Sequence, residues 1–140
     1  MPDVLVDASA LVALLDESDE AHETCVAALK AITAPLVTVW PALTEAMHLL
    51  GKYPRAQGAL CDIVDDGAVR LADLTSFDFP RIRQLMTKYA DQPMDFADAA
   101  LVCVAERDGL REIVTFDRHF DVYRLPGRAR FVVRPGRNKR

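Results

Sequence analysis

The chain has 140 residues, the size of one ordinary domain, and 51% of them are hydrophobic, which excludes a disordered protein. Three scattered cysteines (Cys25, Cys61 and Cys103) and three dispersed histidines match neither a disulfide framework nor a zinc motif. The net charge is −4, and no apolar run approaches the roughly 20 residues that a bilayer crossing needs, so we expect a cytoplasmic protein without membrane contact.

Short apolar runs alternate with stretches of helical spacing along the whole chain. In chain order, the predicted strands cover residues 4–6, 36–39, 68–71, 113–115 and 131–133. The predicted helices, several of them bounded by proline or glycine, cover residues 8–15, 20–32, 41–50, 55–64, 79–89 and 95–106. Strands that alternate with helices predict an α/β fold with a mainly parallel sheet.

Two carboxylates follow predicted strands directly or nearly so. Asp7 comes after Val4-Leu5-Val6, and Asp117 lies just beyond Ile113-Val114-Thr115. In an open parallel sheet, the functional crevice lies at the carboxyl ends of the strands. A carboxylate among apolar neighbours lowers the stability of the fold and is therefore expected to serve a function, so both residues are candidate site residues.

Further acids belong to two predicted helices. Asp95 and Asp98 are three residues apart and share one face of the first turn of a helix that is apolar on all sides from Ala99 to Ala105. Such a helix is expected to be central, which places Asp98 beside the strand ends. Glu45 lies one turn into the helix that begins at Pro41, near the end of the second strand.

Each acid also has a structural interpretation. Asp95 can be an N-cap, Asp98 can gain from the helix dipole, Asp117 can belong to a turn and Glu45 can be an exposed helix acid. A purely structural role is hardest to find for Asp7. Three or four unpaired carboxylates in one crevice repel one another unless a cation neutralises them. Ligation by oxygen alone favours Mg²⁺ or Mn²⁺, and such ions support phosphodiester hydrolysis.

Four segments together resemble the acidic motifs of PIN domains, in particular the VapC branch. They are "VDASALVALL" with Asp7, "TEAMHLL" with Glu45, "DFADAALVCVAE" with Asp98 and "VTFDRHF" with Asp117. The resemblance covers nearly the whole chain, and its strength lies in the order of the four motifs because no single motif is specific. One departure is His119, where relatives often carry an aspartate.

The resemblance implies a three-layer α/β/α sandwich around a mainly parallel five-stranded sheet, with a PIN domain over residues 1–134 and a basic, flexible tail over 135–140. It also implies a Mg²⁺-dependent endoribonuclease in which Mn²⁺ can substitute, a homodimer and a VapB-like antitoxin partner. By motif, Asp7, Glu45, Asp98 and Asp117 match the catalytic acids, with Asp7, Asp98 and Asp117 as metal ligands. Asp95, Ser9 and Thr115 match accessory positions.

Basic side chains gather at the carboxyl-terminal end. Residues 1–117 carry a net charge of −11, whereas residues 118–140 carry +7. This segment is either a partner for a polyanion or a solvated, partly disordered terminus. Together with the tail, Arg81, Arg83 and Arg118 are candidates for contacts with an RNA backbone.

Other α/β classes with acidic sites fit the residues less well. A haloacid-dehalogenase-type phosphatase needs a second aspartate where Ser9 stands, and a response-regulator receiver needs a late-strand lysine, which is absent between Ile113 and Phe131. No glycine-rich loop indicates a nucleotide site. The remaining alternative is a PIN domain that acts as a non-catalytic RNA- or protein-binding module.

Overall fold

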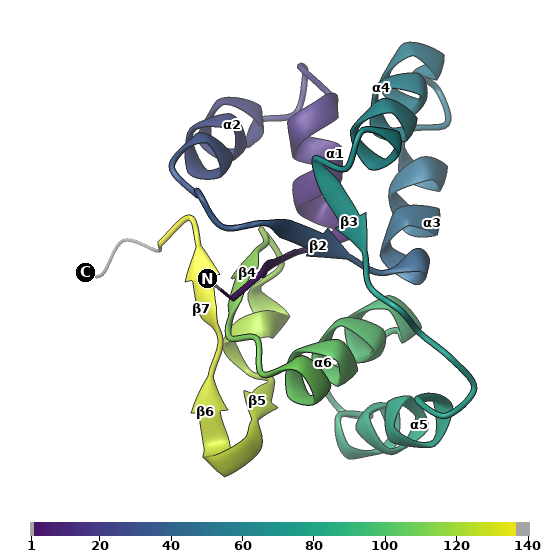
Figure 1. Ribbon diagram of the computed structural model, residues 1–140, viewed down its shortest axis with the longest axis vertical. Helices are drawn as coiled ribbons and strands as arrows, with labels where there is room; N and C mark the ends of the chain where they lie inside the picture. Colours follow the sequence, from purple (N-terminus) through teal and green to yellow (C-terminus); the bar gives the residue numbers. More distant parts are fainter. Residues whose placement is uncertain (1, 137–140) are drawn as a thin grey trace.

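The computed structural model describes residues 2–136, which form five parallel strands and the helices that cover them (Figure 1). The sheet has the order β3-β2-β1-β4-β7. Its strands are β1 (Val4–Val6), β2 (Leu36–Thr38), β3 (Val69–Leu71), β4 (Glu112–Val114) and β7 (Val132–Arg134). The prediction of a parallel five-stranded α/β fold is confirmed.

Within residues 2–136, six α-helices lie around this sheet. They are α1 (Ala8–Leu15), α2 (His22–Lys30), α3 (Trp40–Leu49), α4 (Pro54–Asp65), α5 (Phe79–Lys88) and α6 (Phe96–Asp108). Helix α1 packs against α2 and α4, whereas α6 packs against α5 on the other side of the sheet (Figure 1). Helix α3 contacts both α1 and α6 and therefore joins the two helical layers.

The burial of each element follows from its sequence. All three residues of β1 are buried, as expected for a central parallel strand that is covered on both faces. Every residue of α6 from Ala97 to Ala105 is buried as well, which confirms that this helix is central. Cys25 and Cys103 are free thiols in the core, in line with their apolar surroundings in the sequence.

The order of strands reverses beside β1. From β1 the chain adds β2 and β3 on one side, and it then adds β4 and β7 on the other side. Leu5 pairs with Val37 and with Ile113, so the carboxyl ends of β1, β2 and β4 lie together at one edge of the sheet. A crevice at such a reversal is where open α/β sheets bind ligands.

The segment from 118 to 136 differs most from the sequence-based expectation. It is folded rather than disordered, with two short 3₁₀ turns (Arg118–Asp121 and Pro126–Arg128) and an antiparallel hairpin of β5 (Arg124–Leu125) and β6 (Ala129–Arg130). The strand predicted over 131–133 is shifted to β7 (Val132–Arg134), and the hairpin was not predicted. Phe120 and Tyr123 anchor the segment because both are fully buried.

The predicted boundary between a domain over 1–134 and a tail over 135–140 falls near the end of the described chain. Pro135 and Gly136 are described, whereas residues 137–140 lie outside the described residues. No helix within residues 2–136 is long and apolar enough to span a membrane.

Candidate active site

Asp7 lies at the point where β1 passes into α1, and three hydrogen bonds hold its carboxylate. Its Oδ1 accepts from the Ser9 hydroxyl at 2.7 Å and from the Ala10 backbone N–H at 3.0 Å, and its Oδ2 accepts from the Thr115 hydroxyl. Asp7 is therefore the N-cap of α1, a structural role that the sequence analysis did not find. Burial nevertheless raises its pKa from 3.8 to about 6, in spite of the three donors.

Ser9 and Thr115 connect this carboxylate to the end of β4. The Ser9 hydroxyl accepts from the backbone N–H of Phe116 at 2.9 Å, and the Thr115 hydroxyl accepts from that of Asp117 at 2.9 Å. These two hydroxyls thus link the end of β1 to the loop that carries Asp117. Ser9 and Thr115 therefore lie beside the first and last acids, and their accessory role at the site stays a prediction.

Asp95 and Asp98 form a reciprocal capping box at the start of α6. Asp95 Oδ1 accepts from the backbone N–H of Asp98 at 2.8 Å, and Asp98 Oδ2 accepts from that of Asp95 at 3.3 Å. The structural interpretation of Asp95 as an N-cap is confirmed. Asp98 has a second partner that the sequence did not indicate, because Oδ2 also accepts from the Tyr123 hydroxyl at 3.2 Å.

The Asp98 carboxylate lies in an unfavourable electrostatic environment. Its pKa is raised from 3.8 to about 7, mainly by burial and further by the neighbouring carboxylates of Asp95 and Asp117, against two hydrogen bonds that lower it. This residue therefore holds its proton more tightly than an ordinary aspartate. A helix N-terminus lowers such a pKa when it acts alone, so the raised value reflects the burial and the acids nearby.

Glu45 and Asp117 complete the set. Burial raises the pKa of Glu45, and the charges of Asp95, Asp7 and Asp117 add to the effect. Within residues 2–136 no hydrogen bond or ion pair holds the Glu45 carboxylate. Asp117 Oδ1 accepts from the backbone N–H of His119 at 2.9 Å and contacts its Nδ1 at 2.7 Å. Acids from four separate elements thus influence one another at a single edge of the sheet.

The hydrogen bonds that hold Asp7, Asp98 and Asp117 were not predicted from the sequence. Their own neighbours supply hydrogen bonds, and in the part of the chain that is described no three His, Cys, Asp or Glu side chains converge to form a ready metal site. Within residues 2–136, however, no Lys or Arg pairs with any of the five acids. Asp7, Glu45 and Asp98 have raised pKa values and no Lys or Arg partner, and such oxygen donors fit a hard divalent cation.

The arginines selected from the sequence occupy different environments. Arg81 on α5 binds Glu106 through two hydrogen bonds of 2.7 Å, and Glu106 lies eight residues beyond Asp98, roughly 12 Å along α6. This pairing argues against a free Arg81 for RNA. Arg83 and Arg118 are exposed, and Arg118 directly follows Asp117. Farther along, Arg124 is occupied by the backbone carbonyls of residues 121–123.

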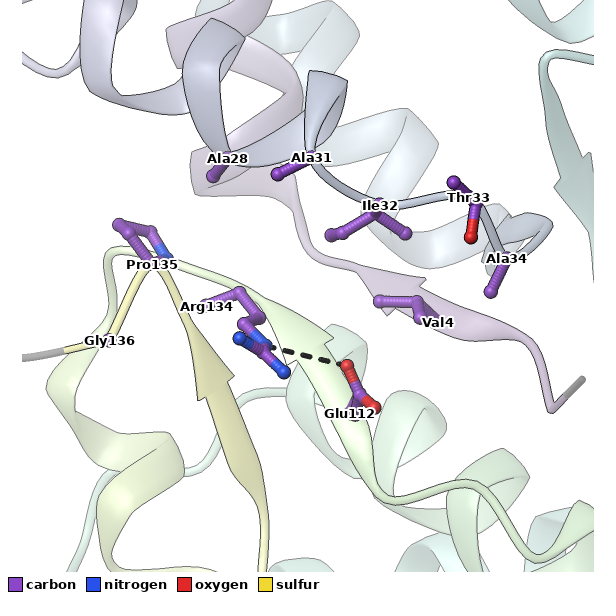
Figure 2. A pocket seen from close by; sticks show the side chains of 10 residues that line it. All are labelled: Val4, Ala28, Ala31, Ile32, Thr33, Ala34, Glu112, Arg134, Pro135 and Gly136. Atoms are coloured by element: carbon purple, nitrogen blue, oxygen red, sulfur yellow. Dashed lines mark ion pairs between the residues drawn. The ribbon is translucent and has the colours of Figure 1, made fainter.

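The cavity shown in Figure 2 lies away from the acids. Its volume is about 330 Å³, and it is lined by Val4 and Glu112 at the amino ends of β1 and β4, by the end of α2 and the residues after it, and by residues 134–136 at the end of β7. The two charged side chains that line it, Arg134 and Glu112, form an ion pair of 3.4 Å with one another. It contains none of the candidate site residues.

A parallel sheet with acids gathered at its topological reversal is typical of α/β proteins whose functional site lies at the carboxyl ends of the strands. Comparison with known proteins narrows this class. The sequence profile of the PIN domain matches residues 4–125. Ribonuclease VapC26 of Mycobacterium tuberculosis (strain ATCC 25618 / H37Rv) is 30% identical over 135 residues, which cover 94% of this chain and all of that protein. The chain therefore belongs to the PIN-domain family, in its VapC branch.

Solved structures share the fold. The crystal structure of M. tuberculosis VapC20, described as a sarcin-ricin loop cleaving toxin, superposes with a TM-score of 0.76 at 22% identity and covers 82% of this chain and 90% of that chain. The crystal structure of PAE2754 from Pyrobaculum aerophilum superposes with a TM-score of 0.56 at 25% identity, over 86% of this chain and 84% of that chain. The likeness to VapC20 supports the fold alone.

Two residues at the site were not found by reasoning from the sequence. Tyr123 donates to Asp98 from 25 residues away, and no local pattern indicates this contact. His119 was noted only as a departure from the family pattern, whereas the structure places it on the Asp117 carboxylate.

Proposed function

We propose that this protein is a metal-dependent endoribonuclease that hydrolyses RNA phosphodiester bonds as the toxin of a VapBC-type toxin–antitoxin pair. The observation that carries the proposal is the group of carboxylates at the reversal of the sheet, with pKa values raised for Asp7, Glu45 and Asp98 and with no Lys or Arg partner within residues 2–136. Full-length similarity to ribonuclease VapC26 supports the same activity.

Asp7, Asp98 and Asp117 would hold Mg²⁺, with Mn²⁺ as a substitute. When bound, such an ion neutralises charge on the scissile phosphate and activates water. Glu45 lacks a hydrogen bond within the described residues, so its carboxylate is free to orient the attacking water or to accept its proton. Asp95 caps α6 and keeps Asp98 at the helix start, while Ser9 and Thr115 hold Asp7 in place.

Exposed Arg83 and Arg118 are the proposed contacts for the RNA backbone, since phosphate contacts position a substrate without reading its sequence. We further propose that the protein acts in the cytoplasm, where RNA substrates are available. We also propose a homodimer, on the likeness of the chain to the VapC family. The proposed partner is a VapB-like antitoxin, which can silence the acids by inserting an arginine among them.

Cleavage of a synthetic single-stranded RNA tests the activity. We expect cleavage in Mg²⁺ or Mn²⁺, none in EDTA and none by the Asp98→Asn variant. The matched control is Asp62→Asn, an exposed aspartate on α4 that we expect to be neutral. A folded protein that binds RNA but does not cleave any substrate in either metal would support the binding-module alternative instead.

A further inference from the structure

Tyr123 places a polar group inside the core beside a candidate metal ligand. Its side chain is fully buried, and its ring packs edge-on against Tyr89 and Phe120, with centroid distances of 5.1 Å in both cases. A phenylalanine would make the same ring contacts. The hydroxyl is therefore explained by its acceptor, Asp98 Oδ2 at 3.2 Å, since a buried phenol needs a partner.

The two hydrogen bonds on Asp98 involve the same oxygen. Oδ2 accepts from the Tyr123 hydroxyl and, at 3.3 Å, from the backbone N–H of Asp95. Within residues 2–136, Oδ1 accepts no hydrogen bond. The carboxylate is thus held by one oxygen, and the other oxygen is available to a ligand.

Asp117 is held in the same manner. Its Oδ1 meets both the backbone N–H and the Nδ1 of His119, and its Oδ2 has no hydrogen bond within the described residues. A carboxylate oxygen accepts in a hydrogen bond, so His119 meets Asp117 as a donor through Nδ1. The His119 ring lies nearly parallel to the Tyr123 ring, at 19° and 6.4 Å between centroids. The adjacent side chains of Tyr123 and His119 therefore contact two acids, Asp98 and Asp117, that are 19 residues apart in the sequence.

We propose that Tyr123 and His119 are positioning residues that hold one oxygen each of Asp98 and Asp117 and leave the other oxygens for a shared divalent cation. The inference rests on the proposed function. Partners that orient metal ligands usually affect metal affinity by about 10- to 100-fold when they are removed. Tyr123 is buried whereas His119 is partly exposed, so we expect the larger effect from Tyr123.

Calorimetric titration with Mn²⁺ alone tests this. The Tyr123→Phe variant keeps the ring and loses only the hydroxyl, and we expect its dissociation constant for Mn²⁺ to rise about tenfold or more. Tyr89→Phe is the matched control, because it also removes a phenol hydroxyl from this ring cluster. The Tyr89 hydroxyl accepts from the Arg124 backbone N–H and contacts no acid within the described residues. Its affinity for Mn²⁺ should stay within about twofold of wild type.

His119 provides the second arm of the test. His119→Ala should weaken Mn²⁺ binding, whereas His119→Asn should restore most of it, because the asparagine amide places a donor near the position of Nδ1. The Mn²⁺ concentration that gives half-maximal RNA cleavage should shift by the same factor as the affinity in each variant, while a purely structural role would alter the melting temperature alone.

The outcomes separate the two proposals. If wild type binds Mn²⁺ and cleaves RNA but Tyr123→Phe and His119→Ala bind Mn²⁺ as wild type does, positioning is refuted and the proposed function stands. If Tyr123→Phe fails to fold, the Mn²⁺ affinities of His119→Ala and His119→Asn decide the question: a loss in the first that the second restores supports positioning, and equal affinities refute it. If wild type binds no Mn²⁺, the proposed metal site is refuted and the positioning role with it.

Discussion

Replacing Asp7 by asparagine should stabilise the metal-free protein. The change removes a buried negative charge while keeping the size and shape of the side chain. The asparagine oxygen can still accept from Ser9 and from the Ala10 N–H, and its amide can donate to the Thr115 hydroxyl. Thr115 can then turn its proton toward the Ser9 hydroxyl, which lies 3.4 Å away. No buried group is left without a partner.

The magnitude follows from the raised pKa of Asp7. A pKa raised from 3.8 to about 6 makes the ionised side chain cost about 3 kcal/mol of native-state free energy at pH 8. An amide forms weaker hydrogen bonds than a carboxylate, so we expect a net gain of about 2 kcal/mol. With an unfolding entropy typical of a 140-residue domain, this corresponds to a rise of roughly 7 °C in melting temperature.

Thermal melts in EDTA at pH 8 measure this directly. Asp62→Asn is the control, because that aspartate is exposed and its replacement should change the stability by less than about 0.5 kcal/mol. A melting temperature for Asp7→Asn that falls several degrees below wild type would refute the reasoning. It would mean that the negative charge of Asp7 stabilises α1 as its N-cap by more than the burial of this charge destabilises the core.

Four further predictions follow from the same acids. Since the pKa values of Asp7 and Asp98 are raised in the native state, the metal-free native protein binds more protons than the unfolded chain between pH 4 and 7. The free energy of unfolding of wild type should therefore fall as the pH rises through this range, and the stabilisation by Asp7→Asn should vanish below about pH 4. Urea melts at several pH values in this range measure both effects. Mn²⁺ at 100 times its dissociation constant should stabilise wild type by about 2.7 kcal/mol and leave the stability of Asp98→Asn unchanged, as measured in a thermal-shift assay. An equal rise in melting temperature for both proteins would exclude Asp98 as a ligand. Asp95→Ala should lower the free energy of unfolding by about 1 kcal/mol through loss of the α6 cap, as measured by denaturant melts, with no loss contradicting the capping role. Expression of wild type should slow growth and that of Asp7→Ala should not, and co-expression of a small gene encoded beside it should restore growth; equal toxicity of the two proteins would show that catalysis is not the cause.

The fold could be predicted because its signals are local. Apolar runs of three or four residues indicate buried strands, and the apolar helix that begins at Asp95 indicates a central helix. The order of these elements is sufficient to place Asp7 and Asp117 at neighbouring strand ends. The positions of the candidate acids therefore follow from chain order and from one rule about parallel sheets.

The surroundings of the acids could not be predicted, because distant residues supply them. Thr115 reaches Asp7 across 108 positions, and Tyr123 reaches Asp98 across 25. The hairpin of β5 and β6 was missed for another reason, since two-residue strands are too short to show an alternating pattern. The capping role of Asp7 is hard to predict because it depends on the residue at which the strand ends and the helix begins.

The pairing of β1 with β4 has a consequence during synthesis. Asp7 leaves the ribosome 110 residues before Asp117, which takes roughly 6 to 20 s at common elongation rates. Until β4 has emerged and paired with β1, Asp7 has neither its Thr115 donor nor Asp117 beside it. A nascent chain therefore cannot bring the acids together early, and the proposed activity would arise only when translation is nearly complete.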